Sequence, residues 1–387
     1  MSQKTLYPLL LSDNLHTKVW GGTRIKPMKG LAPDSERIGE SWECSAVPGS
    51  ESIVENGIFA GRTLNSLVEE YGEKLLGKKV FKMYGAKFPL LIKFIDAEHD
   101  LSIQVHPDNK MAKEYHDSFG KTEMWYVMDA KPGAKIYSGF TREITAQEFY
   151  DRCRNCTIDQ VLNVIEPKKG DVLFITPGTV HAADGGLLIA EIQESSDMTF
   201  RLYDWGREFN PATARKMHIE EAIDVIDYRP FDFSNYKRAH EHDHEMIESL
   251  VECPQFNVSK INLTDPLHIY TEKFGSFIVY ICLEGAASIQ VPSTKENGEA
   301  YMENYEFAKG ETILIPADLP DFFLVPRDSS TKLLEAVTRP EDAVDAYIDP
   351  ETEAFLENED YEGLEDGAFD DDEPQTPAGA SPLNFFN

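Results

Sequence analysis

Short runs of apolar and β-branched residues, separated by glycine and proline turns, dominate the middle of the chain. Such runs, when they are bounded by turn residues, are typical of β-strands. Many short strands of this kind favour a β-sandwich or barrel. The predicted strands cover residues 88–95, 101–105, 123–128, 171–175 and 187–193 and, beyond Pro254, residues 277–282 and 312–316.

Three stretches instead show helical spacing of their apolar residues. Residues 61–83 carry leucines and valine at such a spacing and predict one or two helices. Residues 145–165 and 212–227 predict one helix each. The chain is therefore expected to be mainly β, with a few peripheral helices.

A weak internal repeat divides the strands into two groups. Residues 170–177 and 310–316 share a glycine, an acidic residue and four apolar or β-branched positions, which predicts two related β-modules. His181 follows the first glycine by eleven residues, whereas Asp321 stands at that distance from the second. Only the first module is therefore expected to bind a metal.

Four residues of the first module are candidate metal ligands. Gln104 and His106 are two residues apart, so on a strand their side chains leave the same face. Glu123 and His181 would have to join them from other strands. Two imidazoles, a carboxylate and an amide oxygen suit zinc or a similar divalent metal and leave room for water or substrate. Gln-x-His by itself is also compatible with an ordinary polar strand face.

Composition and charge limit the number of domains, the location and the partners that we expect. The 387 residues are 41% hydrophobic and 27% charged, enough for one large or two ordinary domains. No apolar run is long enough to span a bilayer and no signal peptide is recognisable, so a cytoplasmic location is expected. The net charge of −31 argues against nucleic acid as a partner.

About half of the net negative charge lies in the last 47 residues. Residues 341–373 contain 16 acidic side chains, and no Lys or Arg follows Arg339. Such a run repels itself and cannot bury a core, so residues 346–387 are expected to form a disordered tail. Its apolar end at residues 382–386 suggests a hypothetical docking segment, for the parent domain or a neighbouring subunit.

Two further clusters have mainly structural interpretations. The five cysteines are odd in number and scattered, which argues against a disulfide framework. Cys153 and Cys156 form a lone CxxC in a stretch with helical spacing, and a redox or metal role is the alternative. The histidines at 240, 242 and 244 lie in a polar connector, where a solvated loop is expected and adventitious metal binding is the alternative.

The motifs now support a family resemblance. The segment from Gly170 to His181 resembles the second motif of the cupins, and Gln104-x-His106 with Glu123 resembles a variant of the first. Narrower matches resemble class I mannose-6-phosphate isomerases of the short bacterial type over roughly residues 5–340. These matches are WGG at 20–22, GESWE at 39–43, LSIQVHPD at 101–108, GKTEMWYV at 120–127, TPGTVHA at 176–182 and SSDMTFRLYDWGR at 195–207.

The resemblance implies a fold of two cupin-like jelly-roll modules. The expected division places a metal-binding catalytic module at residues 1–210 and a helix with a polar connector at 211–252. A second, metal-free module then covers 253–345, before the acidic tail at 346–387. The resemblance favours a monomer as much as a homodimer.

The resemblance also implies an activity, the interconversion of mannose 6-phosphate and fructose 6-phosphate through a cis-enediol. Its four ligands would be Gln104, His106, Glu123 and His181, holding one Zn²⁺ or another divalent metal per chain. Arg201 matches the family's active-site arginine, which binds phosphate or stabilises charge. Lys121, Lys93 and Glu191 are the candidates for moving the proton, with a structural Lys93–Glu191 ion pair as the alternative. Two other functions compatible with a cupin are a metal-dependent oxygenase and a non-catalytic sugar-phosphate-binding protein.

Overall fold

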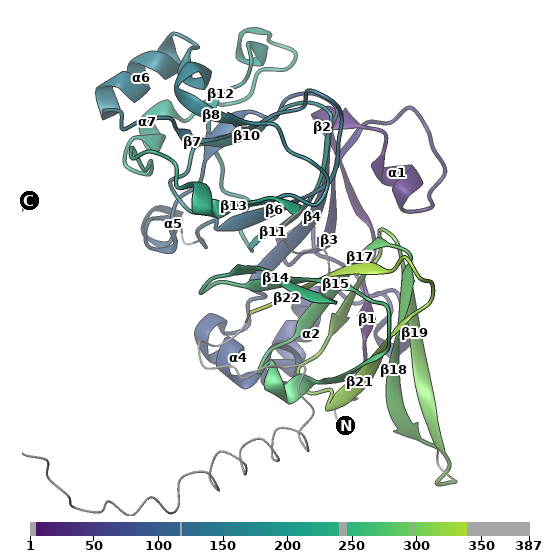
Figure 1. Ribbon diagram of the computed structural model, residues 1–387. Helices are drawn as coiled ribbons and strands as arrows, with labels where there is room; N and C mark the ends of the chain where they lie inside the picture. The colour runs from purple at the N-terminus through teal and green to yellow at the C-terminus, as the bar shows by residue number, and fades with distance from the viewer. Residues whose placement is uncertain (1–4, 117, 240–245, 296, 339–387) are drawn as a thin grey trace, which may run out of the picture. The chain divides into compact units, whose positions relative to one another are not determined.

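The structure is a computed structural model that describes residues 5–116, 118–239, 246–295 and 297–338. Two β-modules follow one another along this part of the chain, each made of two antiparallel sheets (Figure 1). Both modules belong to one compact unit. The expected class, mainly β with two modules and a few peripheral helices, is confirmed.

In the first module a seven-stranded sheet faces a five-stranded sheet. Fourteen buried hydrophobic residues, among them Trp125, Leu173 and Ile189, form the core between the two sheets. The seven-stranded sheet has the order β13 (Tyr236–Lys237), β9 (Val172–Ile175), β6 (Glu123–Ala130), β11 (Leu187–Glu194), β4 (Leu90–Ala97), β2 (Asn14–Gly22) and β3 (Ile38–Cys44). The five-stranded sheet has the order β12 (Phe200–Tyr203), β5 (Ile103–Val105), β10 (His181–Ala183), β7 (Ile136–Phe140) and β8 (Leu162–Ile165).

The second module repeats this arrangement with a six-stranded and a four-stranded sheet. Its core contains seventeen buried hydrophobic residues, among them Tyr280, Phe322 and Leu324. The six-stranded sheet has the order β1 (Leu9–Leu10), β20 (Thr312–Ile315), β17 (Ile278–Glu284), β22 (Lys332–Val337), β15 (Asn257–Asn262) and β14 (Ile247–Glu252). The four-stranded sheet has the order β16 (Leu267–Tyr270), β21 (Asp321–Pro326), β18 (Ala286–Thr294) and β19 (Ala300–Ala308).

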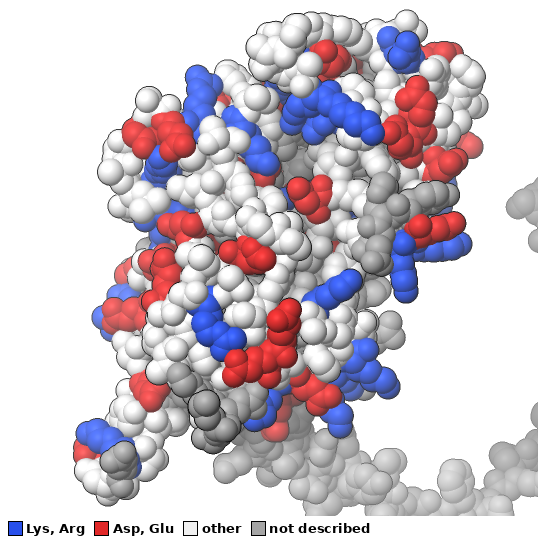
Figure 2. Space-filling view, turned by 180° about the vertical axis from the view of Figure 1, so that it is seen from behind, with Lys and Arg blue, Asp and Glu red and all other residues white. Residues whose placement is uncertain are grey.

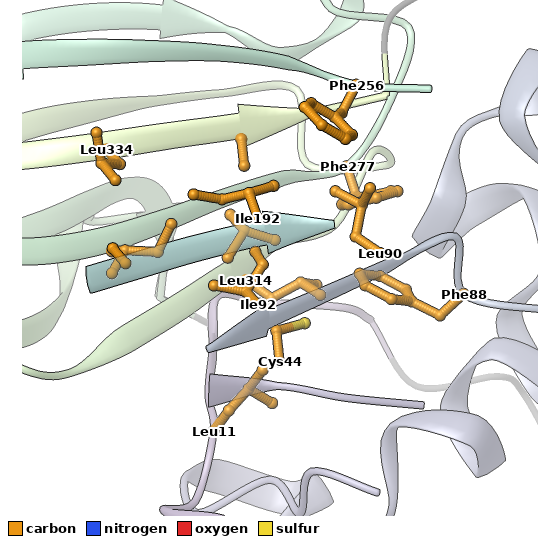
Figure 3. Packing of buried hydrophobic residues seen from close by; sticks show 14 of the residues in the cluster. Leu11, Cys44, Phe88, Leu90, Ile92, Ile192, Phe256, Phe277, Leu314 and Leu334 are labelled. Atoms are coloured by element: carbon orange, nitrogen blue, oxygen red, sulfur yellow. The ribbon is translucent and has the colours of Figure 1, made fainter. Parts of the chain in front are cut away.

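A third core joins the modules, because the outer faces of the two larger sheets pack on each other. Ile92 and Ile192 come from the first module, whereas Leu314 and Leu334 come from the second (Figure 3). Strands buried on both faces need apolar residues at nearly every position. This requirement explains why β4 and β11 have continuous rather than alternating apolar sequences.

The helices match the expectations only in part. Residues 61–83 contain three short helices that contribute to the core between the modules: α2 (Leu64–Tyr71), α3 (Glu73–Leu76) and α4 (Lys78–Tyr84). Residues 145–165 form α6 (Ala146–Arg154), a 3₁₀ turn (Ile158–Val161) and strand β8. Two further helices are α1 (Ile25–Met28) and α5 (Asn109–His116).

The prediction of a helix over residues 212–227 is wrong for most of its length. Only α7 (Ile219–Ala222) is α-helical there. The preceding backbone is held by Arg201, which donates from Nη1 to the carbonyl oxygen of Lys216 (2.9 Å) and accepts at its own carbonyl from the N–H of His218 (2.8 Å). These tertiary contacts outweigh the local helical preference.

Several other expectations concern the cysteines, the connector and the tail. All five cysteines are free, and Cys153 is buried in α6. The histidines at 240, 242 and 244 and the acidic segment from 346 onward lie outside the described residues. Among the described residues, no helix is long and apolar enough to cross a membrane.

Candidate metal centre and active site

The five-stranded sheet places three of the predicted residues side by side. On β5, Gln104 lies opposite His181 of β10 on one side and opposite Arg201 of β12 on the other. Their sequence neighbours, such as Ile103 and Leu202, pack into the core on the outer face of this sheet. Because successive side chains alternate between faces, all three predicted residues point into the first module.

Glu123 reaches the same place from the seven-stranded sheet. Its Oε1 lies 2.9 Å from Nε2 of His181, and its Oε2 lies 3.6 Å from Nε2 of His106. The two imidazoles and the carboxylate are buried, and each offers a ligand atom within 4.8 Å of the others. The structure therefore brings His106, directly after β5, together with Glu123 of β6 and His181 of β10 at one point that could hold a metal ion.

Backbone carbonyls fix the orientation of both imidazoles. Nδ1 of His106 donates to the carbonyl oxygen of Met198 (2.8 Å), and Nδ1 of His181 donates to that of Thr179 (2.9 Å). Each Nε2 then keeps a lone pair, as in histidines that bind metals; Nε2 of His181 lies beside Glu123, and Nε2 of His106 lies 3.2 Å from Nζ of Lys121. Burial, together with the Lys121 ammonium, lowers the pKa of His106 well below its usual range, so this ring is neutral at pH 7.

Glu123 is an ionised group without adequate hydrogen bonding. Burial alone would raise its pKa, but Lys121 and the two imidazoles outweigh burial and hold the pKa well below the usual range. Nζ of Lys121 lies 2.8 Å from Oε2, yet neither carboxylate oxygen has a partner with hydrogen-bond geometry. Buried acceptors left in this state are costly, and a cation between them and the imidazoles would satisfy them.

Gln104 can be the fourth metal ligand only if its side-chain amide is turned. Its Nε2 lies 3.3 Å from Nε2 of His181, and an amide nitrogen is not a metal ligand. A half-turn of the amide presents the oxygen instead, and amide orientations are assigned from hydrogen bonds. With this half-turn, the four residues fit a divalent metal.

Lys93 and Glu191 form a buried ion pair on the facing sheet. They are opposite each other on β4 and β11, and Nζ of Lys93 lies 3.0 Å from Oε2 of Glu191. Nζ also donates to Oε1 of Gln193 (2.6 Å), and Nε1 of Trp125 donates to Oε1 of Glu191 (2.9 Å). Oε2 of Glu191 is buried and, apart from the ion pair with Nζ of Lys93, has no hydrogen-bond partner.

The charge state of Lys93 is set by its acidic neighbours. Burial alone would lower its pKa, but Glu191 and Glu40 outweigh burial and hold the pKa above its usual value. Lys93 is therefore an ammonium at neutral pH and cannot accept a proton. The same ammonium, with that of Lys18, lowers the pKa of Glu40 to about 2 although burial alone would raise it.

Arg201 is held at the inner face by two hydrogen bonds. Nε donates to Oγ of Ser102 (3.3 Å), and Nη1 donates to the carbonyl oxygen of Lys216. Burial and the nearby Arg215 lower its pKa, but a guanidinium remains charged in proteins. The side chain is half-buried and presents a fixed positive charge beside Gln104.

Gln193, Trp125 and Asp204 were not predicted as contributors to this region. Gln193 lies two residues after Glu191 on one strand, and this spacing of two was the signal that could have identified it. Buried Asp204 binds Arg207 and Arg215 (2.7 and 2.5 Å) and so fixes the segment next to Arg201. No sequence pattern indicated that ion-pair group.

In the second module other residues occupy the places of the candidate ligands. Glu123 lies opposite Ile175 in the first module, and Ile278 occupies that place opposite Ile315 in the second. The pair of His181 and Gln104 corresponds to Asp321 opposite Tyr270. Of the described residues, only His106, Glu123 and His181 form a cluster of potential ligands.

Two histidines close to the first motif in sequence, His99 and His116, match no ligand position. His99 is exposed and contacts Arg37, away from the cluster. The side chain of His116 is outside the described part. On the face drawn in Figure 2, basic and acidic side chains are interspersed, so no extended basic surface of the kind that binds nucleic-acid backbones covers this face.

Comparisons with known proteins point to one family. A model of the phosphomannose isomerase type I catalytic domain matches residues 9–133. Mannose-6-phosphate isomerase ManA of Bacillus subtilis is 33% identical over 326 residues, covering 83% of this chain and 96% of that protein. The mannose-6-phosphate isomerase of Streptococcus mutans is 40% identical over 219 residues, covering 57% of this chain and 67% of that protein.

A solved structure agrees with these sequence matches. The crystal structure of the mannose 6-phosphate isomerase from Bacillus subtilis superimposes with a TM-score of 0.72 at 29% identity, covering 85% of this chain and 99% of that one. A phosphomannose isomerase from Salmonella typhimurium, 18% identical with a TM-score of 0.67, shares the fold. The chain belongs to the type I phosphomannose isomerase family.

Proposed function

We propose that this chain interconverts mannose 6-phosphate and fructose 6-phosphate through a cis-enediol, with one divalent metal held by Gln104, His106, Glu123 and His181. The family membership supports the reaction. Two imidazoles, one carboxylate and one amide oxygen suit Zn²⁺. The substrate is a sugar phosphate that enters the first module.

The observation that carries the proposal is that the Glu123 carboxylate is buried and lacks hydrogen-bond partners. A fully buried carboxylate without adequate hydrogen bonds faces two imidazoles whose Nδ1 atoms are already bound to backbone carbonyls. Such an arrangement is costly for a purely structural cluster and suitable for a metal. A bound divalent metal supplies Lewis acidity that stabilises negative charge on the sugar oxygens O1 and O2.

Glu191 is the side chain that we assign to proton transfer at carbon. Lys93 is held as an ammonium, so it serves as the cationic partner of Glu191 in a buried position. Glu191 and Glu123 occupy diagonal positions on the paired strands β11 and β6, so their Cα atoms are roughly 7–8 Å apart across the two strands. A sugar bound at the metal centre would then present its C1–C2 unit to Oε2 of Glu191.

Arg201 and Lys121 supply positive charge to the anionic substrate. Arg201 has a planar fork suited to phosphate or to a developing oxyanion. Lys121 lies next to Glu123 and His106, where its ammonium can donate a hydrogen bond to a sugar oxygen. Together they offset the negative charge that a sugar phosphate brings into a buried site.

A coupled assay of mannose 6-phosphate conversion, with metal analysis of the same samples, tests the proposal. Chelation should abolish turnover and zinc should restore it. Glu123→Gln keeps the side-chain shape and removes the charge, so it should lower metal content and reduce kcat by at least about 100-fold. Glu55→Gln, at an exposed position, is the matched control and should behave as the wild type.

Two results would count against the proposal. Full turnover after complete metal removal would refute the metal's role. Stoichiometric metal without isomerase turnover would favour a binding protein, or an oxygenase if oxygen were consumed with bound iron.

A further inference from the structure

A cavity lies where the two modules meet. Its volume is about 530 Å³, within the usual range for small-molecule sites, which often occur between domains. The segment around Arg24 forms one wall, and the back of β6 and β11 forms the floor. Leu283 and Lys332 from β17 and β22 line the opposite wall.

This cavity is separate from the metal centre. Its floor contains Tyr126, Met128 and Leu188, which alternate along their strands with inward-facing residues such as Trp125 and Ile189. Because alternate side chains leave opposite faces of a sheet, the cavity and the metal centre lie on opposite sides of the seven-stranded sheet.

Basic groups outnumber acidic groups in the lining. Lys169 and Lys332 both pair with Glu284, the latter at 3.6 Å, so two ammonium groups share one carboxylate. The exposed Lys309 makes no ion pair with any described residue. This basic wall is unusual in a chain whose net charge is −31.

Arg24 adds a fourth cation that is held in place. Its Nε lies 2.6 Å from Oδ1 of the fully buried Asp96, and Nη1 lies 3.3 Å from Oδ2 of Asp129. Gly22 permits this contact, because a Cβ there would lie 2.3 Å from Oδ2 of Asp96. When the buried Asp96 is counted with Asp129 and Glu284 of the lining, four cations are balanced by three anions, and Lys309 supplies the excess positive charge.

We propose that this cavity is a second ligand site, which binds an organic phosphate whose apolar part packs on Tyr126, Met128 and Leu188 while its phosphate meets Lys309 and Lys332. A purely apolar ligand would leave the Lys309 ammonium without an anionic partner, and a bare inorganic anion would leave the apolar floor uncovered. Nucleotides combine both features. The site is distinct from the one that the substrate occupies in the proposed function.

Calorimetric titration of the full chain with ADP tests this site. Adenosine, which lacks the phosphate, and inorganic phosphate, which lacks the apolar part, are the control ligands. We expect saturable binding of ADP, at least 10-fold weaker binding of the other two, and weakening by added salt. Lys309→Ala/Lys332→Ala should weaken ADP binding at least 10-fold. Lys78→Ala/Lys82→Ala, at exposed positions on α4, removes the same charge elsewhere and should leave ADP binding unchanged.

The Arg201→Ala variant shows whether ADP binds in this cavity or in the active site. ADP binding should persist in that variant. Loss of ADP binding in Arg201→Ala together with its retention in the Lys309/Lys332 variant would assign the nucleotide to the catalytic site and overturn the proposal. Absence of ADP binding by the wild type, or equal effects of the two double-lysine variants, would overturn it as well.

Discussion

The pair of Lys93 and Glu191 can serve catalysis, stability or both, and substitutions can separate these roles. Glu191→Gln leaves the buried Lys93 ammonium without its counter-charge, so it should cost about 3–5 kcal/mol of unfolding free energy as well as activity. Lys93→Met/Glu191→Leu removes both charges and should recover most of that stability. If Glu191 moves the proton, kcat should stay at least about 100-fold low in the double variant. Recovery of activity together with stability would show that the pair is only structural.

The pKa of Glu40 predicts a measurable dependence of stability on pH. Its folded pKa of about 2 lies below the ordinary 4.5, so its contribution to stability is fully present above about pH 5. That contribution is lost as the pH falls towards 2, and it amounts to about 3 kcal/mol. Urea unfolding should therefore show that Glu40→Gln destabilises the protein at pH 7 and progressively less at pH 4 and 3. A difference that is independent of pH would contradict this assignment.

At the scale of elements, the turn before β10 decides whether His181 reaches the metal centre. Gly178 has φ +85°, and its N–H donates to the carbonyl oxygen of His106 (2.9 Å). A Cβ at this position would lie 2.9 Å from the carbonyl oxygen of Val225. The turn therefore ties together the backbone segments that carry His106 and His181, two of the proposed ligands.

Gly178→Ala should lower both stability and metal affinity. Gly133→Ala is the matched control, because φ is +82° there and nothing lies within 4 Å of the added Cβ. Both variants should lose about 1–2 kcal/mol from the positive φ, but only Gly178→Ala should also bind metal less tightly. Denaturant unfolding and metal titration measure the two effects, and equal metal affinity in both variants would exclude a positioning role for this turn.

At the scale of the whole molecule, the two modules share a core and should unfold together. Phe277 of the second module is fully buried and its ring centroid lies 4.6 Å from that of Phe88 in the first. Phe277→Ala should cost about 3–5 kcal/mol and lower Tm while calorimetry still shows one transition. Phe233→Ala, at a position 57% exposed, should change Tm little. Two separate transitions in the Phe277 variant would show that the modules are independent.

The sequence was sufficient for features that depend on local pattern and spacing. Short apolar and β-branched runs bounded by turn residues identified strands such as β6, β9 and β20, because buried strands need such runs. Gln104 and His106 were identified as neighbours for the same reason. Glu123 and His181 were identified through motifs, since no local rule relates residues on separate strands.

Tertiary structure decided what depends on contacts between distant segments. β1 joins the sheet of the second module. Residues 212–218 do not form a helix, because Lys216 and His218 are held by hydrogen bonds with Arg201. Lys93 keeps its charge because carboxylates from other strands surround it. The cavity with four basic side chains arises only where the modules meet. The sequence by itself thus determined many of the strands, the repeat and the candidate ligand residues, whereas only packing fixed their partners, because burial and charge depend on neighbours far away in the chain.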